Sequence, residues 1–343
     1  MSRGLVLGGG GLIGMAYHAG ALKALDEMGL NPSGADLIVG TSAGAILGSY
    51  LSAGWTPQDF SDYAHGVHPD SVAGDDEQAD EVRRLFSPLY SSHLERARRM
   101  TGGAFAAVSA RGYFRPGAGG RVPLRLLRKA FPSGMYSTAE TRERFHNDLP
   151  AEWPERDIFL CAVDLYSGAR VPFGREDAPE ASFPDAVLAS TAIPGVFPPV
   201  RIGDRQYVDG GTSSATSLDL AVEAGCDKIL CIAPLGYRTD EALLARDPRM
   251  WPPMLIRSLF ARALKREVGQ ARALGIDVFV IRPWLTELKQ HGTNSMRHHD
   301  RAAVVESARI GTIRLLEDHL AHPVIKDLAR ANKRVAKKKA RSV

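Results

Sequence analysis

The sequence predicts an α/β fold whose central sheet is mostly parallel. Two successive strand–glycine–helix units support this prediction. The apolar strand 5–7 runs into glycines 8–11, and a helix with apolar residues at helical spacing follows to about residue 28. A second strand, 35–39, leads into an apolar helix over 43–53 that Gly54 ends. Helices that follow strands in this order connect parallel strands, so we expect helices to cover the sheet.

The middle of the chain, about 56–154, differs from its flanks because it is richer in charge and in loop residues. We expect a mostly helical insertion there. The rest of the chain returns to alternating strands and helices. The predicted elements are a hairpin over 158–173, a helix over 183–191, a strand ending at 208, a helix over 218–224, a strand over 228–233, a helix over 252–274, a strand over 277–281 and a helix over 301–319.

One domain over residues 1–325 and a basic tail over 326–343 are the organisation that we expect. The net charge is +4, but the last fourteen residues carry seven basic residues and no acidic one. Removing these seven from the 43 basic residues leaves 36 against 39 acidic residues, which gives no reason to expect a nucleic-acid-binding body. We predict that the tail is a solvated, frayed end, and the alternative is an electrostatic tether to anionic lipid.

Cysteine usage and hydropathy predict the cellular compartment of the protein. Its three cysteines lack the spacing of a metal or redox site, which suits small buried side chains in a reducing compartment. Residues 4–11 pass from a short strand into glycines and do not resemble a signal peptide. The uncharged stretch 37–58 contains too many glycines and hydroxyl side chains to span a membrane. We therefore expect a cytoplasmic protein, peripheral at a membrane at most, without metal or cofactor.

The motif Gly40-Thr41-Ser42-Ala43-Gly44 stands where a predicted strand meets a predicted helix. This placement fits a G-x-S-x-G nucleophile elbow, in which a sharp turn exposes the serine hydroxyl. The residues two before and two after the serine must be small, and both are glycine here. The turn also puts Ser42 at a helix N-terminus, where backbone N–H groups such as that of Ala43 favour developing negative charge. A tight glycine turn with an incidental serine is the alternative.

The first glycine run, Gly9-Gly10-Gly11-Leu12-Ile13-Gly14, also fits the G-x-G-x-x-G pattern of a dinucleotide-binding turn. Such a site needs an acidic residue at the end of the second strand, whereas Asp36 stands at the start of that strand. The same glycines suit an oxyanion hole, because bare backbone lets several N–H groups converge on one oxygen. We therefore name Gly9, Gly10 and Gly11 as candidate donors.

A serine nucleophile needs a base, and the residues alone leave its identity open. The chain has ten histidines, of which His18 lies inside the first helix and His298 and His299 in a polar loop. None follows a predicted strand, so we expect structural or solvated roles for them. Asp209 follows an apolar strand and precedes Gly210 and Gly211. It is either a base presented at the sheet edge or the aspartate of an Asx turn.

Three motifs come in the order and spacing of patatin-like phospholipases. They are the run from Gly8 to Gly14, the Gly40 to Gly44 motif and Asp209-Gly210-Gly211. The segment 189–200 is similar to the stretch that this family carries before its last motif. The chain thus resembles the family from about Gly4 to Ala224, outside the insertion. The resemblance implies a three-layer α/β/α patatin-like fold, hydrolysis of fatty acyl esters of lipids, and a dyad without histidine in which Ser42 is the nucleophile and Asp209 the base.

Two departures from the family pattern favour a rival interpretation. Ile13 stands where many bacterial members carry Arg or Lys, and residues 212–217 replace a common Asn-x-Pro run. The rival is a catalytically silent member that binds lipid or acts as a scaffold.

A segment shortly before Asp209 offers apolar side chains for a substrate. Ile193, Val196 and Phe197 either line a pocket for the acyl chain or pack in the core, and both interpretations stay open. The expected partner is a lipid or another acyl ester, and no nucleic acid is expected.

Overall fold

The computed structural model describes residues 2–71, 84, 86–110, 133–238, 251–291 and 301–341. The chain forms two compact units where we expected one domain. The first unit combines Met1–Ser71 with Ala215–Val343, and the second is Val72–Ser214. The chain therefore leaves the first unit after its first two strands and returns to it after Asp209.

The first unit contains four parallel strands in the order β2, β1, β7, β8. They are β1 (Arg3–Leu7), β2 (Leu37–Thr41), β7 (Lys228–Ile232) and β8 (Asp277–Ile281). Leu7, the last residue of β1, pairs with Gly40 on one side and Ile232 on the other. The carboxyl ends of these strands thus share one edge. The predicted α/β fold with a mostly parallel sheet is confirmed.

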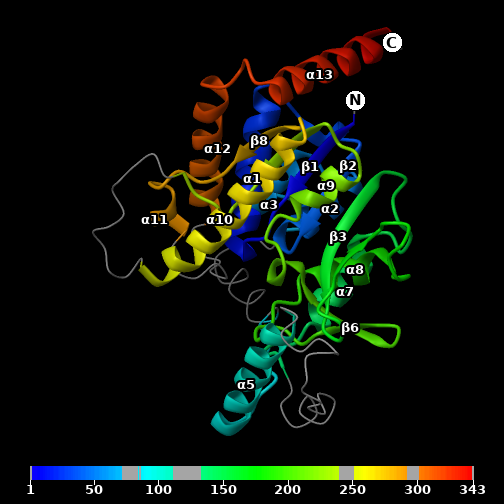
Figure 1. Ribbon diagram of the computed structural model, residues 1–343, viewed down its shortest axis with the longest axis vertical. Coiled ribbons are helices and arrows are strands. Elements are labelled where there is room, and N and C mark those ends of the chain that lie inside the picture. Colours follow the sequence, from blue (N-terminus) through cyan, green and yellow to red (C-terminus); the bar gives the residue numbers. More distant parts are fainter. Residues whose placement is uncertain are drawn as a thin grey trace. The chain divides into compact units, whose positions relative to one another are not determined.

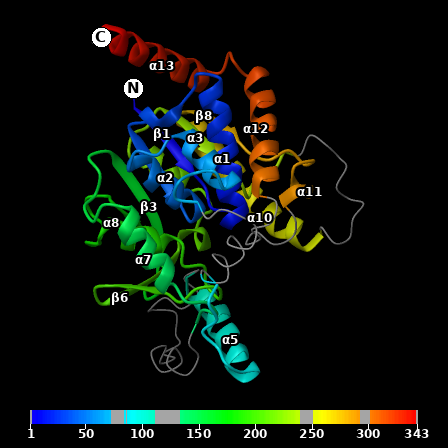
Figure 2. The same ribbon diagram turned by 180° about the vertical axis from the view of Figure 1, so that it is seen from behind.

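Helices cover this sheet, and the largest packing contact joins α1 to α12. The helices of the first unit are α1 (Gly11–Glu27), α2 (Ala43–Ser52), α3 (Pro57–His65), α9 (Leu218–Glu223), α10 (Trp251–Ala273), α11 (Leu288–His291), α12 (Arg301–Glu317) and α13 (Pro323–Arg341), with a short 3-10 helix η1 at Pro32–Gly34. Gly20 of α1 packs against the backbone of Val305 in α12, where a Cβ atom would collide. Figure 1 and Figure 2 show α1 and α12 side by side from both directions.

The second unit has an antiparallel sheet in the order β4, β3, β6, β5. Its strands are β3 (Asp157–Asp164), β4 (Arg170–Phe173), β5 (Val200–Ile202) and β6 (Arg205–Asp209), and its helices are α5 (His93–Ala110), α7 (Ala139–Asp148) and α8 (Phe183–Ser190), with a 3-10 helix η2 at Gly210–Thr212. Asp209 pairs with Ala162 of the buried strand β3. The described helices α5 and α7 lie within 56–154, and the helical insertion expected over that segment stays a prediction.

The start of that predicted insertion differs from the structure. Residues 57–65 form α3, which belongs to the first unit and packs on α1. A capping box begins this helix, because the Thr56 hydroxyl accepts from the Asp59 N–H and the Asp59 carboxylate accepts from the Thr56 N–H. The predicted charge-rich segment thus began one helix too early.

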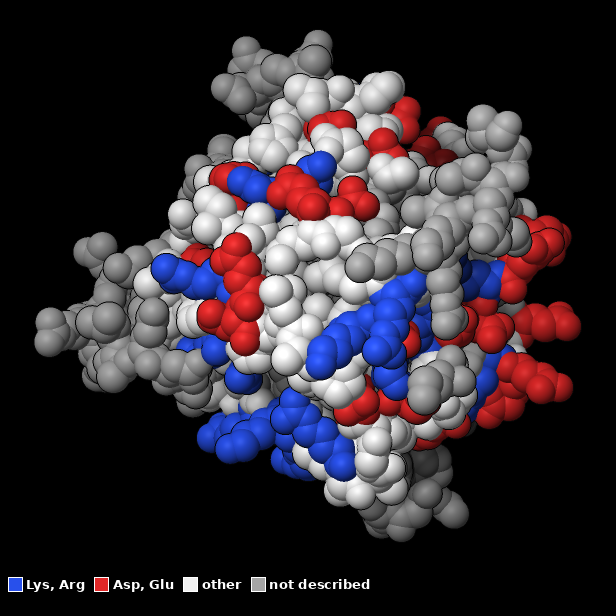
Figure 3. Space-filling view, turned by 90° about the horizontal axis from the view of Figure 1, so that it is seen from above, with Lys and Arg blue, Asp and Glu red and all other residues white. Residues whose placement is uncertain are grey.

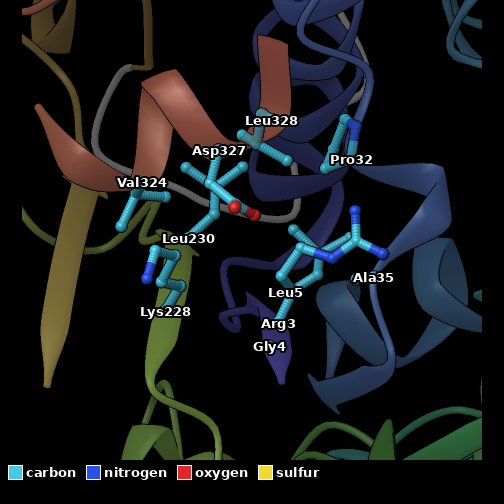
Figure 4. Close-up of a pocket in the computed structure, with 10 residues that line it drawn as sticks. All are labelled: Arg3, Gly4, Leu5, Pro32, Ala35, Lys228, Leu230, Val324, Asp327 and Leu328. Atoms are coloured by element: carbon cyan, nitrogen blue, oxygen red, sulfur yellow. The ribbon is translucent and has the colours of Figure 1, made fainter. Parts of the chain in front are cut away.

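The C-terminal segment also differs from the predicted frayed tail, because α13 is helical from Pro323 to Arg341. Alanine, lysine and arginine, which dominate this segment, are strong helix formers. Val324 and Leu328 of α13 are buried, and Figure 4 shows them with Asp327 around a small pocket that Leu5 and Leu230 also line. Burial of apolar side chains at the amino-terminal edge of the sheet therefore anchors the helix.

Candidate active site

Ser42 lies between β2 and α2 with φ 56° and ψ −119°. A positive φ is uncommon for a residue with a Cβ atom, and strained backbone of this kind concentrates at functional sites. A Cβ atom at Gly40 would lie 2.7 Å from the Cα atom of Ala45, and one at Gly44 would collide with the carbonyl group of Leu7. The two motif glycines therefore permit the close approach of strand and helix that a nucleophile elbow requires.

The glycine-rich loop follows β1 at the same edge of the sheet. Its backbone is held from two sides, because the Gly8 N–H donates to the Ile232 carbonyl at 2.9 Å and the Gly9 N–H donates to the Ala215 carbonyl at 2.8 Å. A Cβ atom at Gly9 would lie 3.3 Å from the Cβ atom of Ser42. The loop thus lies directly against the candidate nucleophile.

This hydrogen bonding narrows the set of candidate oxyanion donors. The N–H of Gly9 already donates to a carbonyl, which weighs against its predicted role. The first N–H groups of a helix have no intrahelical acceptor. Gly10 caps α1 and Gly11 is its first residue, while Ser42 caps α2 and Ala43 is its first residue. The N–H groups of Gly10, Gly11 and Ala43 therefore remain the candidates, at two helix N-termini that favour negative charge.

Close packing explains Gly10 of the first motif. A Cβ atom at Gly10 would lie 2.7 Å from the Cα atom of Gly14 and 3.0 Å from the Cβ atom of Pro234.

The dinucleotide interpretation finds no support at Asp36, because its carboxylate accepts from the Arg3 backbone N–H at 2.8 Å at the start of β1. That position is the opposite end of the strands from the glycines.

His18 of α1 contacts the backbone of the glycine loop. Its Nε2 atom lies 2.7 Å from the Gly8 carbonyl oxygen, and full burial lowers the pKa of this imidazole to about 4. A neutral ring therefore donates from Nε2 to the loop. We expected a structural role for His18 but not this contact, which its position on the buried face of α1, ten residues after Gly8, could have indicated. His298 and His299 lie outside the described residues.

Asp209 ends β6 in the second unit and is buried. Its backbone N–H donates to the Ala192 carbonyl at 3.0 Å, and its Oδ1 atom accepts from the Gly211 N–H at 2.7 Å. A Cβ atom at Gly210 would collide with the carbonyl oxygen of Cys161. The Asx turn proposed as the alternative is therefore present, and it fixes the orientation of the carboxylate that the other interpretation needs.

The predicted acyl-pocket residues form a turn before β5. Ile193, Val196 and Phe197 are each half-buried. The Val196 carbonyl accepts from the Met135 and Tyr136 N–H groups, and the Phe197 ring stacks on Phe86 with 5.9 Å between the ring centroids. This partial exposure separates the three side chains from the fully buried core, and their role as a pocket remains a prediction.

Ile13, the residue that departs from the family pattern, is buried in the first turn of α1. Its side chain belongs to the apolar core of the first unit, so the position offers no cation to a ligand.

A profile of patatin-like phospholipases matches residues 5–222, which include both glycine motifs, Ser42 and Asp209. The chain belongs to the patatin-like phospholipase family. The family consists of lipid hydrolases, and its fold agrees with the parallel sheet and flanking helices described above. Membership confirms the resemblance and the fold class predicted from the sequence.

Curated relatives of this patatin-like chain include two mycobacterial proteins. These are the uncharacterised NTE family proteins Mb2594 of Mycobacterium bovis and Rv2565 of Mycobacterium tuberculosis, each 26% identical over 259 residues. The alignment covers 75% of this chain and 35% of each relative. The chain therefore spans about a third of the length of the curated relatives that it matches.

Two solved structures are also similar to this patatin-like chain. VipD from Legionella pneumophila aligns with a TM-score of 0.42 and 15% identity over 93% of this chain and 67% of VipD. The type III effector protein ExoU aligns with a TM-score of 0.33 and 16% identity over 92% of this chain and 53% of ExoU.

None of the helices in the described part of the chain combines the length and the apolar character that crossing a bilayer requires.

Proposed function

We propose that this chain is a serine acyl hydrolase of the lipase or phospholipase A type, which cleaves fatty acyl esters of lipids. The backbone of Ser42 is the observation that carries the proposal. Its positive φ and the two close-packed motif glycines are the features of a nucleophile elbow. The glycine loop beside Ser42 supplies backbone N–H groups where an oxyanion would form.

In the proposed first step, the Ser42 Oγ atom attacks the acyl carbonyl carbon, and Asp209 accepts the hydroxyl proton. The carbonyl oxygen becomes an oxyanion, which the N–H groups of Gly10, Gly11 and Ala43 stabilise. Collapse of this intermediate breaks the ester bond, and the departing alcohol or lysolipid takes the proton from Asp209. Water then attacks the acyl-enzyme with Asp209 again as the base, which releases the fatty acid and restores Ser42.

The choice of a carboxylate as base has a physical requirement. An aspartate with its ordinary pKa near 3.9 is a weak base for a hydroxyl group. Asp209 is buried at the end of its strand, and the hydrogen bond from the Gly211 N–H orients its carboxylate. We expect modest turnover, with oxyanion stabilisation as the larger contribution.

Active-site labelling tests the proposal. A fluorophosphonate probe should modify the wild type and the control variant Ser52→Ala, whose hydroxyl bonds the Gly48 carbonyl on the same helix. The probe should leave Ser42→Ala unmodified. Equal labelling of wild type and Ser42→Ala would contradict the assignment of the nucleophile. Absence of labelling and of ester hydrolysis in the wild type would favour a catalytically silent lipid-binding protein.

The base is tested separately with p-nitrophenyl acyl esters. Asp209→Asn should lose hydrolysis while circular dichroism shows an unchanged fold, and Asp36→Asn, at the opposite end of the strands, should retain activity. Retained hydrolysis in Asp209→Asn would mean that another group, such as a histidine, is the base.

We also propose that the basic segment 326–343 contacts anionic lipid at a membrane periphery in the cytoplasm. The exposed side chains Lys326 and Arg330 begin this basic stretch on α13. Figure 3 shows Lys and Arg groups separated by acidic and neutral residues on the face that it views. The charges on that face are mixed, so we place the proposed tether on α13 itself.

A further inference from the structure

The segment Ala215-Thr216-Ser217 lies where the chain returns to the first unit, between η2 and α9. It belongs to residues 212–217, which depart from the family pattern. All three residues are buried, although two of them carry a hydroxyl group. Buried polar groups are normally hydrogen-bonded, so the partners of this segment show what it holds together.

The first contact of the segment is with the glycine loop. The Ala215 carbonyl accepts from the Gly9 N–H at 2.8 Å. A Cβ atom at Gly8 would lie 3.2 Å from the Ala215 carbonyl oxygen and 3.2 Å from the Thr216 Cγ2 atom. The segment therefore packs closely on the two residues that precede the candidate oxyanion donors, and it fixes the direction of the second N–H.

The second contact is with the turn that carries Ser42. The Thr41 hydroxyl donates to the Ser217 hydroxyl in a long hydrogen bond of 3.4 Å, and both side chains are fully buried. Thr41 is the last residue of β2 and directly precedes Ser42. One segment of the chain thus bonds both the glycine loop and the strand end that leads into the proposed nucleophile.

A third contact ties the segment to α10. The Thr216 hydroxyl donates to the Glu267 carboxylate, with 2.6 Å between the two oxygen atoms. Hydrogen bonds to a carboxylate are roughly twice as strong as those between neutral groups. Thr216 is buried and Glu267 is half-buried, so water competes little for this bond. Glu267 lies beyond residue 222, where the match to the family ends.

We propose that Thr216 and Glu267 are positioning residues for the proposed hydrolysis. Their hydrogen bond holds the segment 215–217 against the glycine loop, whose Gly10 and Gly11 N–H groups then meet the oxyanion. The inference rests on the proposed hydrolase function. Both residues act through the backbone of the segment, so loss of their bond should lower kcat and leave KM nearly unchanged.

Isosteric variants test this hydrogen bond. Thr216→Val keeps a methyl group beside Gly8 and removes the hydroxyl, so it should lower kcat for p-nitrophenyl butyrate about ten- to hundredfold and change KM less than about twofold. Glu267→Met removes the acceptor and should have the same effect. Thr216→Ser keeps the hydroxyl and Glu267→Gln keeps an acceptor oxygen, so both should retain kcat within about threefold.

Thr312→Val is the matched control, because it makes the same replacement at a buried threonine of α12. It should retain the wild-type kcat. Circular dichroism and thermal unfolding verify that each variant folds, and Glu267→Met carries the test if Thr216→Val does not fold. Wild-type kcat in Glu267→Met, or an equal loss of kcat in Thr216→Ser and Thr216→Val, would overturn the proposal.

Hydrogen exchange separates this proposal from the proposed function. The Gly9 amide, followed by NMR of glycine-labelled protein, should exchange about tenfold faster in Thr216→Val than in the wild type or Thr312→Val. If the wild type hydrolyses no ester but the exchange rates still differ, the hydrolase function fails and the anchoring of the loop survives. If esters are hydrolysed and Thr216→Val changes neither kcat nor exchange, the positioning role fails alone.

Discussion

Replacement of Ser42 by glycine should give a more stable protein than replacement by alanine, and both variants should lack the proposed activity. Ser42 has φ 56° and ψ −119°, a region that residues with a Cβ atom rarely adopt. Such backbone costs on the order of 1–3 kcal/mol, and glycine in its place costs about 0.5–1 kcal/mol of extra conformational entropy. The net expectation is a gain of about 1 kcal/mol for Ser42→Gly relative to Ser42→Ala.

The comparison with Ser42→Ala isolates the backbone term. Both variants lose the hydroxyl group and its contacts, and only the alanine variant keeps a Cβ atom at the positive φ. A second positive-φ serine, Ser217, lies in the ordinary left-handed region at φ 51° and ψ 36°, where the strain is smaller. Ser217→Gly compared with Ser217→Ala should therefore show a smaller gain.

Thermal unfolding and urea titration measure the difference. A gain of about 1 kcal/mol corresponds to a rise in Tm of about 2–4 °C for a unit of 150–250 residues. Both Ser42 variants should lack esterase activity and fluorophosphonate labelling. If Ser42→Gly is no more stable than Ser42→Ala, the backbone at this turn is not strained and the elbow argument loses its main observation.

Three further predictions concern packing, pH and the membrane. Gly44→Ala should lower the free energy of unfolding measured by urea denaturation by about 3 kcal/mol or more, because the new Cβ atom would overlap a β1 carbonyl. The control Gly34→Ala, whose Cβ atom would meet open space, should change this free energy by less than about 1 kcal/mol. Burial lowers the pKa values of His18 and His291 to about 4 and 3, so the folded state binds fewer protons than the unfolded state. The free energy of unfolding should therefore be highest above pH 6.5 and fall by about 2 kcal/mol per histidine between pH 7 and 5. A urea midpoint that stays constant over that interval would contradict this prediction. Replacing the lysines at 337–339 by glutamates should weaken sedimentation with phosphatidylserine vesicles by about 1 kcal/mol or more per residue, and equal binding of both forms would refute the tether.

The sequence predicted the features that depend on local patterns. The pattern of apolar strands that end in glycine and are followed by helices predicts β1, β2 and the turn at Ser42. The glycines at 40 and 44 were expected to be small for close packing, and the collisions that a Cβ atom would make there agree with that reasoning.

Features set by contacts distant in sequence were missed. The Gly9 N–H was a predicted oxyanion donor, but it bonds Ala215, which lies more than 200 residues away. The division into two units depends on the antiparallel sheet around β3. No motif in the sequence predicts that sheet. Charge alone suggested a frayed tail, whereas the anchoring of α13 by Val324 and Leu328 depends on tertiary packing.

The hydrogen bond from the Gly8 N–H to the Ile232 carbonyl limits how far the chain can be shortened from its C-terminus while the glycine loop keeps its structure. The span that matches the patatin-like family ends at residue 222, before β7 begins at Lys228. A version cut at that point would remove the acceptor of the Gly8 amide and one neighbour of the strand that carries the glycines. The smallest fragment able to hold the loop in place must therefore extend through β7.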